Sequence, residues 1–197
     1  PVEEYLKRIS TYHPQTKPDM CYSASLMNSL NDLGRRIKLS KLRFSLKKMN
    51  KICGYRNGMM CDESIIPKAM SDILEPYNYE WKNERAPGMN IEKLKKISDD
   101  SGMSNPIVTV SSDHFSEIGV KTFGRRRLDH VIIIMGVDHT IIYYYDPFES
   151  FFKGTHKINR TMKIRTFGKL WDGAYEPRWT CWAQPKKVSQ RLLSDFT

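Results

Sequence analysis

The chain has 197 residues, and its 32 Lys and Arg against 22 Asp and Glu give a formal net charge of +10. This length is ample for a real hydrophobic core, and we expect one domain over residues 1–197. Four cysteines without a CxxC pair exclude a disulfide scaffold, and 11% aromatic residues exclude a disordered chain. The longest apolar run, Val131–Met135, is too short to span a bilayer, so we expect no membrane span.

The positive charge does not by itself indicate nucleic acid. Lys and Arg are spread from Lys7 to Arg191 in short clusters, with no continuous basic helix and no zinc-finger spacing. We therefore expect mostly solvated charged faces, although steering of an acidic partner stays open. The sequence opens with no charged segment followed by an apolar one, so we expect no secretion signal and a cytoplasmic location.

The first hundred residues have the spacing of helices. Cys21–Leu33 places apolar residues on one face, and Gly34 is expected to cap its C-terminus. Ser40–Asn50 and Ser64–Leu74 carry similar stripes, and Asn90 is a good N-cap for a short helix reaching residue 97.

After residue 105 the pattern changes to that of strands. Two β-branched and aromatic runs flank Asp138-His139-Thr140, which is typical of a hairpin. The predicted strands are Ile107–Val110, Val131–Val137, Ile141–Tyr145, Met162–Phe167 and Trp179–Trp182. The fold class is therefore expected to be α+β, with a helical part over about 1–100 and a sheet part over about 105–185 that share a core.

Cys21 is the first candidate for chemistry, because it opens the first strong helix. The positive end of a helix dipole favours the thiolate, which is the nucleophilic form of cysteine. A buried, inert thiol is an equally good interpretation on position alone.

His130 is the best candidate for a base, because it stands immediately before the apolar run of a predicted strand. The other four histidines, His13, His114, His139 and His156, lie in segments expected to be loops or turns. A hairpin centred near residues 138–139 pairs positions whose numbers sum to roughly 277, which places Asp146 beside His130. Such an Asp can accept the imidazole N–H and orient the ring.

Gln15 adds a weaker signal. It lies six residues before Cys21, in an irregular segment that could fold its amide back toward the helix start. There the amide and the backbone N–H of Cys21 would form an oxyanion hole for acyl transfer.

This order of residues resembles that of the papain-like cysteine peptidases. The closest likeness is to the bacteriocin-processing peptidases that cleave double-glycine leaders, and to their stand-alone relatives. Those proteins share the Gln before a Cys-bearing helix, the His leading an apolar strand with a Gly (here Gly136), and the Asp-Pro that follows the next strand. The resemblance covers residues of about 12–36 and 128–150. Met20 stands where the transporter-linked members usually carry Asp before the Cys.

The resemblance implies a papain-like fold in which the helix bearing the Cys packs on an antiparallel sheet. It implies Cys21 as nucleophile, His130 as base, Asp146 as the residue that orients His130, and Gln15 in the oxyanion hole. We expect a thiol hydrolase of peptide or isopeptide bonds, with a peptide or protein substrate and neither a metal nor an organic cofactor. The segment of residues 50–105 is not matched.

Two other functions remain open. The same triad could serve an acyltransferase, transpeptidase or deamidase, since the thioester is common to all and only the acceptor differs. The fold could also serve as a non-catalytic basic binding module for a polyanion.

Several residues outside the triad allow two interpretations. Cys53 and Cys61 flank a glycine-containing stretch and would form a disulfide in an exported protein, but thiols are the simpler expectation. Cys181 is expected in the core. Arg125, Arg126 and Arg127 are expected in a solvated loop, with the alternative that they rim the cleft and favour an acidic substrate.

Overall fold

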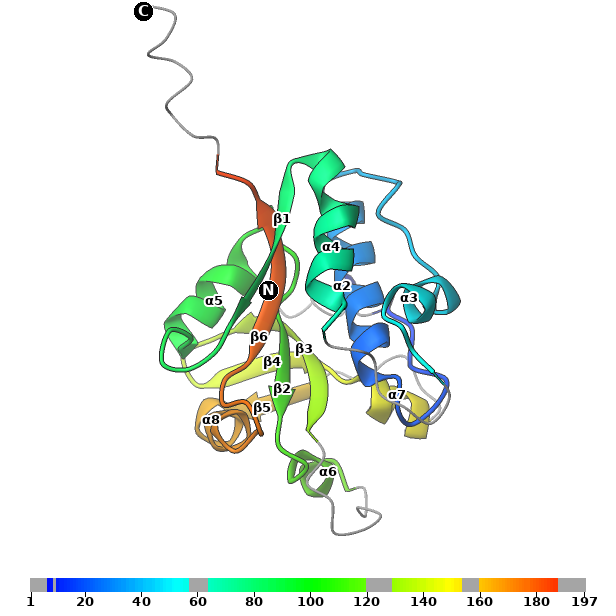
Figure 1. Cartoon of the computed structure of the whole chain (residues 1–197). Helices are drawn as coiled ribbons and strands as arrows, with labels where there is room; N and C mark the ends of the chain where they lie inside the picture. Colours follow the sequence, from blue (N-terminus) through cyan, green and yellow to red (C-terminus); the bar gives the residue numbers. More distant parts are fainter. Residues whose placement is uncertain (1–6, 9, 57–63, 120–128, 154–159, 188–197) are drawn as a thin grey trace, which may run out of the picture.

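A computed structural model describes residues 7–8, 10–56, 64–119, 129–153 and 160–187. In these residues, helices lie on both faces of a six-stranded antiparallel sheet with the strand order β1-β6-β2-β3-β4-β5 (Figure 1). The α+β class predicted from the sequence is therefore confirmed. Among the described residues, no helix combines the length and the apolar character needed to cross a membrane.

The strands are β1 (Tyr79–Glu84), β2 (Ile107–Val110), β3 (His130–Val137), β4 (Ile141–Tyr145), β5 (Arg160–Lys163) and β6 (Thr180–Pro185). The helices are α2 (Cys21–Arg36), α3 (Leu46–Ile52), α4 (Ile66–Leu74), α5 (Ile91–Asp99), α6 (His114–Glu117), α7 (Pro147–Lys153) and α8 (Ile164–Asp172), with a 3-10 turn η1 (Glu75–Tyr77) after α4.

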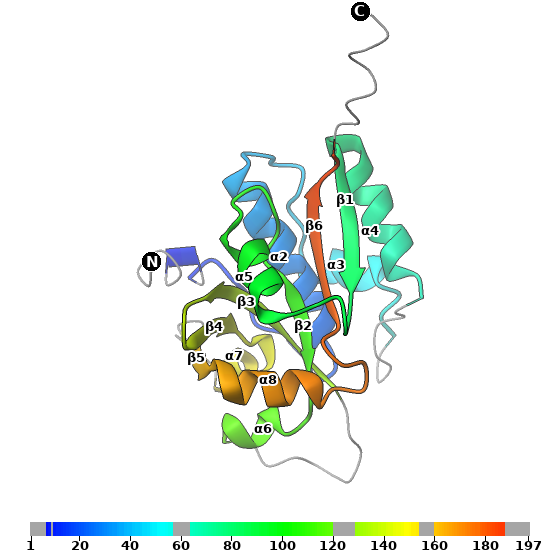
Figure 2. The same cartoon turned by 90° about the vertical axis from the view of Figure 1, so that its left-hand side faces the viewer.

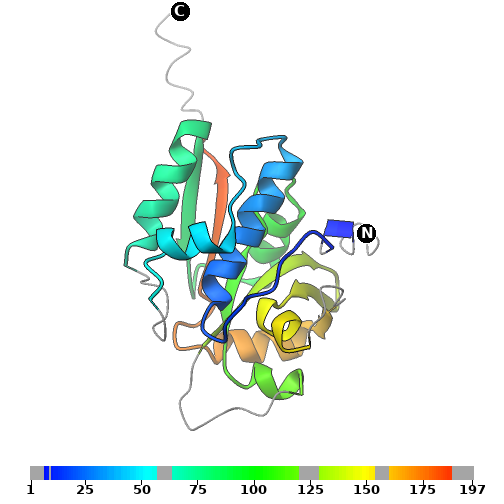
Figure 3. The same ribbon diagram turned by 90° about the vertical axis from the view of Figure 1, so that its right-hand side faces the viewer.

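The sheet separates two apolar clusters. Helices α2, α3 and α4 cover one face (Figure 3), and α5 and α8 cover the other (Figure 2). Successive residues of β3 point to opposite faces, so Val131 and Ile133 join the first cluster while Ile132 and Ile134 join the second. All eight residues of β3 are buried, which explains why its sequence is continuously apolar after His130.

Helix α2 is the central helix of the fold. It packs on β2, β3, α3 and α7, and 13 of its 16 residues are buried. The side-chain amide of Asn28 accepts a hydrogen bond from the backbone N–H of His13 and donates one to its carbonyl, at 2.9 and 2.7 Å. This pair fixes the segment before Cys21 against the helix, because both backbone groups of one residue are satisfied by a buried side chain.

The predicted helices are all present, with shifted ends. Asn90 accepts from the N–H of Lys93 at 2.9 Å, as a helix N-cap does. The second helix begins later than Ser40, because Ser45 is its N-cap and accepts from the N–H of Lys48. Helix α2 continues past Gly34 to Arg36, so the prediction that Gly34 caps it was wrong.

Gly34 is required for close packing instead. A Cβ atom at this position would lie 2.8 Å from the Cβ of Leu42 and 2.9 Å from the carbonyl oxygens of Leu39 and Leu42. Backbone atoms cannot move aside as the end of a flexible side chain can. Only glycine lets the segment of residues 39–42 approach α2 so closely.

We predict that Gly34→Ala lowers the free energy of unfolding by about 2 kcal/mol, because the extra methyl group overpacks this contact. Urea denaturation would measure the loss. Gly168→Ala in α8 is the matched control, since a Cβ there meets nothing within 4 Å. Alanine at position 168 should be neutral or stabilising; equal stability of the two variants would contradict the packing argument.

Two parts of the sheet differ from the sequence prediction. Residues predicted as the strand Met162–Phe167 divide between the end of β5 and the start of α8, where Phe167, Leu170 and Trp171 are buried at helical spacing. Strand β1 was not predicted, and it brings a segment from the helical part to the sheet edge beside β6. The predicted hairpin is present as β3 and β4.

Candidate active site

Cys21 is the first residue of α2, as the sequence predicted. The N-cap residue Met20 makes no side-chain capping bond, and the first turn of the helix contains no acidic residue. No carboxylate of this turn therefore neutralises the positive end of the helix dipole where the thiol lies. Cys21 is buried, with 8% of the residue exposed.

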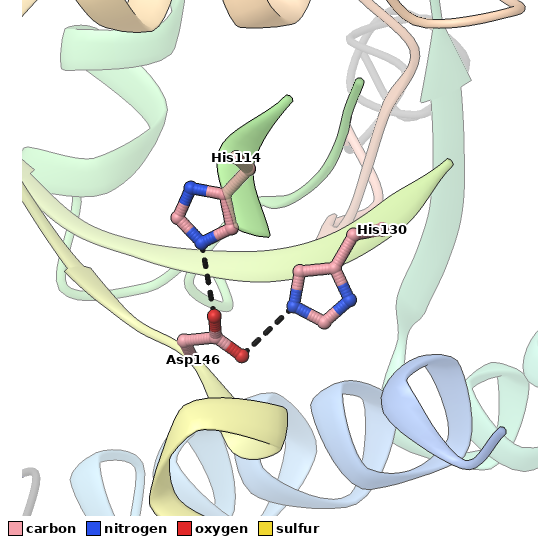
Figure 4. Close-up of side chains that lie close together, drawn as sticks. All are labelled: His114, His130 and Asp146. Atoms are coloured by element: carbon pink, nitrogen blue, oxygen red, sulfur yellow. Dashed lines mark hydrogen bonds and ion pairs between the residues drawn. The ribbon is translucent and has the colours of Figure 1, made fainter. Parts of the chain in front are cut away.

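His130 and Asp146 are brought together at the same end of the hairpin. His130 begins β3, Asp146 follows β4, and both are 2% exposed. The His130 Nε2–H donates to Asp146 Oδ1 at 2.8 Å (Figure 4). The proximity predicted from the hairpin is thus present in the structure.

The predicted register itself was off. The strand pairs are Ile133 with Tyr145 and Gly136 with Tyr143, and a bulge lies between Ile134 and Gly136. Asp146 therefore does not pair with His130 in the ladder but reaches it through its side chain. Bulges insert a residue that a simple count of hairpin positions cannot include.

Asp146 also caps α7, the helix that follows it. Its Oδ1 accepts the backbone N–H groups of Phe148 at 2.8 Å and Glu149 at 3.2 Å, in addition to His130. Since those N–H groups lie in the first turn of a helix, they favour the ionised carboxylate. The short helix α7 was not predicted from the sequence.

The charges of this pair stabilise each other. Burial alone would lower the pKa of His130, but the charge and hydrogen bond of Asp146, together with a hydrogen bond and charge from Cys21, raise it to about 10. Burial alone would raise the pKa of Asp146, but the charge of His130 and the hydrogen bonds from His114 and His130 hold it well below its ordinary range. Because Nε2 of His130 is engaged by Asp146, Nδ1 is the nitrogen left for the Cys21 thiol.

His114 is a site residue that the sequence analysis missed. It was expected in a polar loop, yet it is fully buried at the start of α6, and its Nε2 lies 2.9 Å from Asp146 Oδ2 (Figure 4). Its ring stacks on that of His130 with centroids 5.6 Å apart and an interplanar angle of 11°. The local sequence carries no signal of this, because the contact depends on the β2–β3 pairing that sets Val110 opposite His130.

Aromatic rings shield the pair from water. Phe115 and Phe148 lie with ring centroids 5.0 and 5.9 Å from that of His130, and 5.1 Å from each other. Phe152, on the next turn of α7, stacks on Phe148 and is 58% exposed. An apolar surface therefore runs outward from the imidazole, and the low dielectric beside His130 strengthens its interaction with Asp146.

Gln15 is buried in the segment that precedes Cys21. Its backbone N–H donates to the carbonyl of Pro147 at 3.3 Å, which ties this segment to the residue after Asp146. Its side-chain Nε2 donates to the carbonyl of Lys17 at 2.7 Å, while Oε1 has no partner among the described residues. Because an amide nitrogen carries two hydrogens, one N–H remains beyond the bond to Lys17.

The same histidines and carboxylate form the group of described residues that could hold a metal ion. One ligand atom from each of His114, His130 and Asp146 lies within 4.8 Å of the others. Both ring nitrogens, however, stand 2.8–2.9 Å from carboxylate oxygens, at the length of direct hydrogen bonds. A metal at about 2.0–2.1 Å from each nitrogen would have to displace both protons. The distances thus fit direct hydrogen bonds between the two imidazoles and the carboxylate.

The other residues singled out from the sequence are three cysteines and three arginines, and the structure describes only two of the cysteines. Cys53 and Cys181 are buried thiols in the apolar cluster around α2, as expected for Cys181. Cys61 and the three arginines 125–127 lie outside the described residues, so the disulfide and the basic rim stay predictions.

The sequence matches no protein-family profile, and no curated protein is significantly similar to it. Solved structures do resemble it. The peptidase domain of Streptococcus ComA, a bi-functional ABC transporter involved in a quorum sensing pathway, matches with a TM-score of 0.52 and 15% identity over 88% of this chain and 96% of that one. A putative C39-like peptidase from Bacillus anthracis matches with a TM-score of 0.54 and 14% identity over 92% of this chain and 96% of that one. The predicted resemblance is therefore confirmed at the level of the fold: this chain has the papain-like α+β fold of the bacteriocin-processing peptidase domains.

Proposed function

We propose that this protein is a cysteine hydrolase that cleaves a peptide or isopeptide bond. In this proposal Cys21 is the nucleophile, His130 the base, and Asp146 the residue that orients His130. Gln15 and the backbone N–H of Cys21 form the oxyanion hole. The proposed substrate is a peptide or a protein segment, and a cytoplasmic location would keep the thiol reduced.

One observation carries the proposal. A buried imidazole bonds to a buried carboxylate at 2.8 Å, and its pKa is raised to about 10 by that carboxylate and by the thiol at a helix start. A histidine with a purely structural role does not need a buried carboxylate that raises its pKa. An imidazolium that pairs with a thiolate does need one. The fold shared with two peptidase domains supports the same chemistry.

The reaction would follow the usual order of acyl transfer. Nδ1 of His130 takes the proton of Cys21, and the thiolate attacks the carbonyl carbon. The resulting oxyanion accepts hydrogen bonds from Gln15 and from the Cys21 backbone, and then collapses to a thioester. His130 protonates the leaving amine, next takes a proton from water, and the hydroxide releases the acid and the thiol.

Acyl transfer to an amine would use the same steps until the thioester. Product masses after incubation with added amines separate the two outcomes, because aminolysis leaves an amide where hydrolysis leaves an acid. A non-catalytic polyanion-binding module remains the alternative from another class, and it requires no reactivity at Cys21.

The proposal is tested by alkylation of Cys21 with iodoacetamide between pH 6 and 9, in the presence of EDTA and read by mass spectrometry. An ordinary thiol with a pKa of about 8.5 reacts roughly 200-fold faster at pH 9 than at pH 6. Cys21 should change by less than about tenfold, because a thiolate paired with an imidazolium is already present at pH 6.

His130→Ala removes the proton acceptor, so the ratio of rates between pH 9 and pH 6 should rise to about 100-fold. Comparing rates of one residue at two pH values cancels its limited exposure. If wild type and His130→Ala show equally steep profiles, no such pair exists and the proposal fails.

A further inference from the structure

We infer that His114 is a positioning residue for the proposed reaction, because it holds the Asp146 carboxylate in the orientation that His130 requires. This inference rests on the proposed function and adds a residue to it. His114 need not touch the thiol or the substrate carbonyl for this role. It acts through Asp146.

The two oxygens of Asp146 are satisfied from different sides. Oδ1 accepts from His130, from the N–H of Phe148 and from the N–H of Glu149. Among the described residues, Oδ2 accepts from His114 alone. Without His114, a buried carboxylate oxygen would have no donor, and rotation of the carboxylate toward other donors would become favourable.

The protonation of His114 follows from its surroundings. Its Nδ1 is buried and has no hydrogen-bond partner among the described residues. A proton on Nδ1 would therefore be buried without an acceptor, which is costly, whereas a proton on Nε2 is accepted by Asp146. His114 is thus a neutral donor with its single proton on Nε2, and it places no second positive charge beside the His130 imidazolium.

Packing fixes the His114 ring in this position. The ring is parallel to that of His130 and meets Tyr144 edge-on, with centroids 5.7 Å apart and an interplanar angle of 72°. Its backbone N–H bonds to Ser111 at 3.0 Å and its carbonyl accepts from Ile118 at 3.2 Å, so both backbone groups are also held. Two imidazoles, His114 at the start of α6 and His130 at the start of β3, therefore converge on the carboxylate of Asp146, which follows β4.

The test compares two variants in the alkylation assay described above. His114→Phe keeps a planar ring and removes the donor, so Cys21 alkylation at pH 6 should fall about tenfold as Asp146 loses its orientation. His114→Gln places an amide N–H near the position of Nε2 and should stay within about threefold of wild type. Alkylation of Cys53 and Cys181, both fully buried, reports in the same sample whether the fold is intact.

The outcomes are distinct. If wild-type Cys21 behaves as an ordinary thiol, the proposed function fails whatever His114 does. If wild type shows the pair and His114→Phe matches it, or if both variants lose reactivity equally, the positioning role is overturned.

If Cys53 becomes reactive in His114→Phe, that variant has not folded properly and cannot test the inference. A measurement on the wild-type protein then tests it instead. Nitrogen-15 NMR of the imidazoles should show His114 protonated at Nε2 only, at pH values where His130 carries both protons. A His114 proton on Nδ1, or a proton on each nitrogen, would overturn the inference.

Discussion

Replacing Cys21 with alanine is expected to reduce peptide hydrolysis by at least about a thousandfold, because it removes the thiol that forms the thioester in the proposed mechanism. The change removes one buried sulfur atom, so the free energy of unfolding should fall by only about 1 kcal/mol. A mixture of peptides from a digested proteome, analysed by mass spectrometry for new termini, is the assay, since it presupposes no cleavage preference.

Cys53→Ala is the matched control for this loss. Cys53 is a fully buried thiol in the cluster around α2, and its replacement leaves the candidate site intact. This variant should be somewhat less stable than wild type and fully active. Cleavage retained in Cys21→Ala would remove Cys21 from the mechanism, whatever the stability of either variant.

Asp146→Asn is expected to produce the second large effect. An asparagine presents one acceptor and one donor group, so it cannot accept from both His114 and His130. His130 can then turn its bare Nε2 toward the amide and carry its proton on Nδ1, where it no longer accepts the proton of Cys21. Cys21 alkylation at pH 6 should fall by about 100-fold or more, and loss of a partner from the buried pair should cost about 3 kcal/mol of stability.

The same variant should change how stability depends on pH. The pKa of His130 is about 10 in the folded protein and about 6.5 in an unfolded chain. The folded state therefore holds this proton more tightly, and the resulting stabilisation is complete below pH 6.5 and lost as the pH rises through 10. The pKa of Asp146 is lowered, so its contribution is present above pH 4 and lost in acid.

Urea denaturation at pH 7, 8.5 and 10 would measure this dependence. Wild type should lose stability steadily over this range, whereas Asp146→Asn should lose much less, because its His130 has no carboxylate to raise the pKa. Asp99→Asn is the control, since Asp99 is a half-exposed partner of Lys95 and should leave the wild-type slope unchanged. Parallel slopes in wild type and Asp146→Asn would show that the pair does not stabilise the fold.

Local pattern predicted the elements that carry two of the candidate site residues. Helical spacing after Cys21 and the apolar run after His130 are properties of short segments, and both elements begin at those residues. Local pattern failed at residues 162–167, where the apolar residues fit both the two-residue period of a strand and the 3.6-residue period of a helix. The β-branched residues before Phe167 suggested a strand, but burial of Phe167, Leu170 and Trp171 against the sheet selected a helix.

Proximity across the hairpin was partly predictable. The turn at residues 138–140 forces β3 and β4 to be antiparallel, so Asp146 had to lie near the end of β3 that carries His130. The bulge between Ile134 and Gly136 moved the ladder, yet a side chain at a strand end is long enough to absorb the shift. The contact between Asp146 and His130 was therefore predicted correctly although the predicted strand register was wrong.

The sequence by itself determined the α+β class, the helix that begins at Cys21, and the hairpin that brings Asp146 to His130, because each depends on residues close together in the chain. Only the tertiary structure decided that His114 donates to Asp146 and that β1 joins the sheet beside β6. These depend on pairings between distant segments, where the burial of both partners supplies the free energy and no local pattern records the choice.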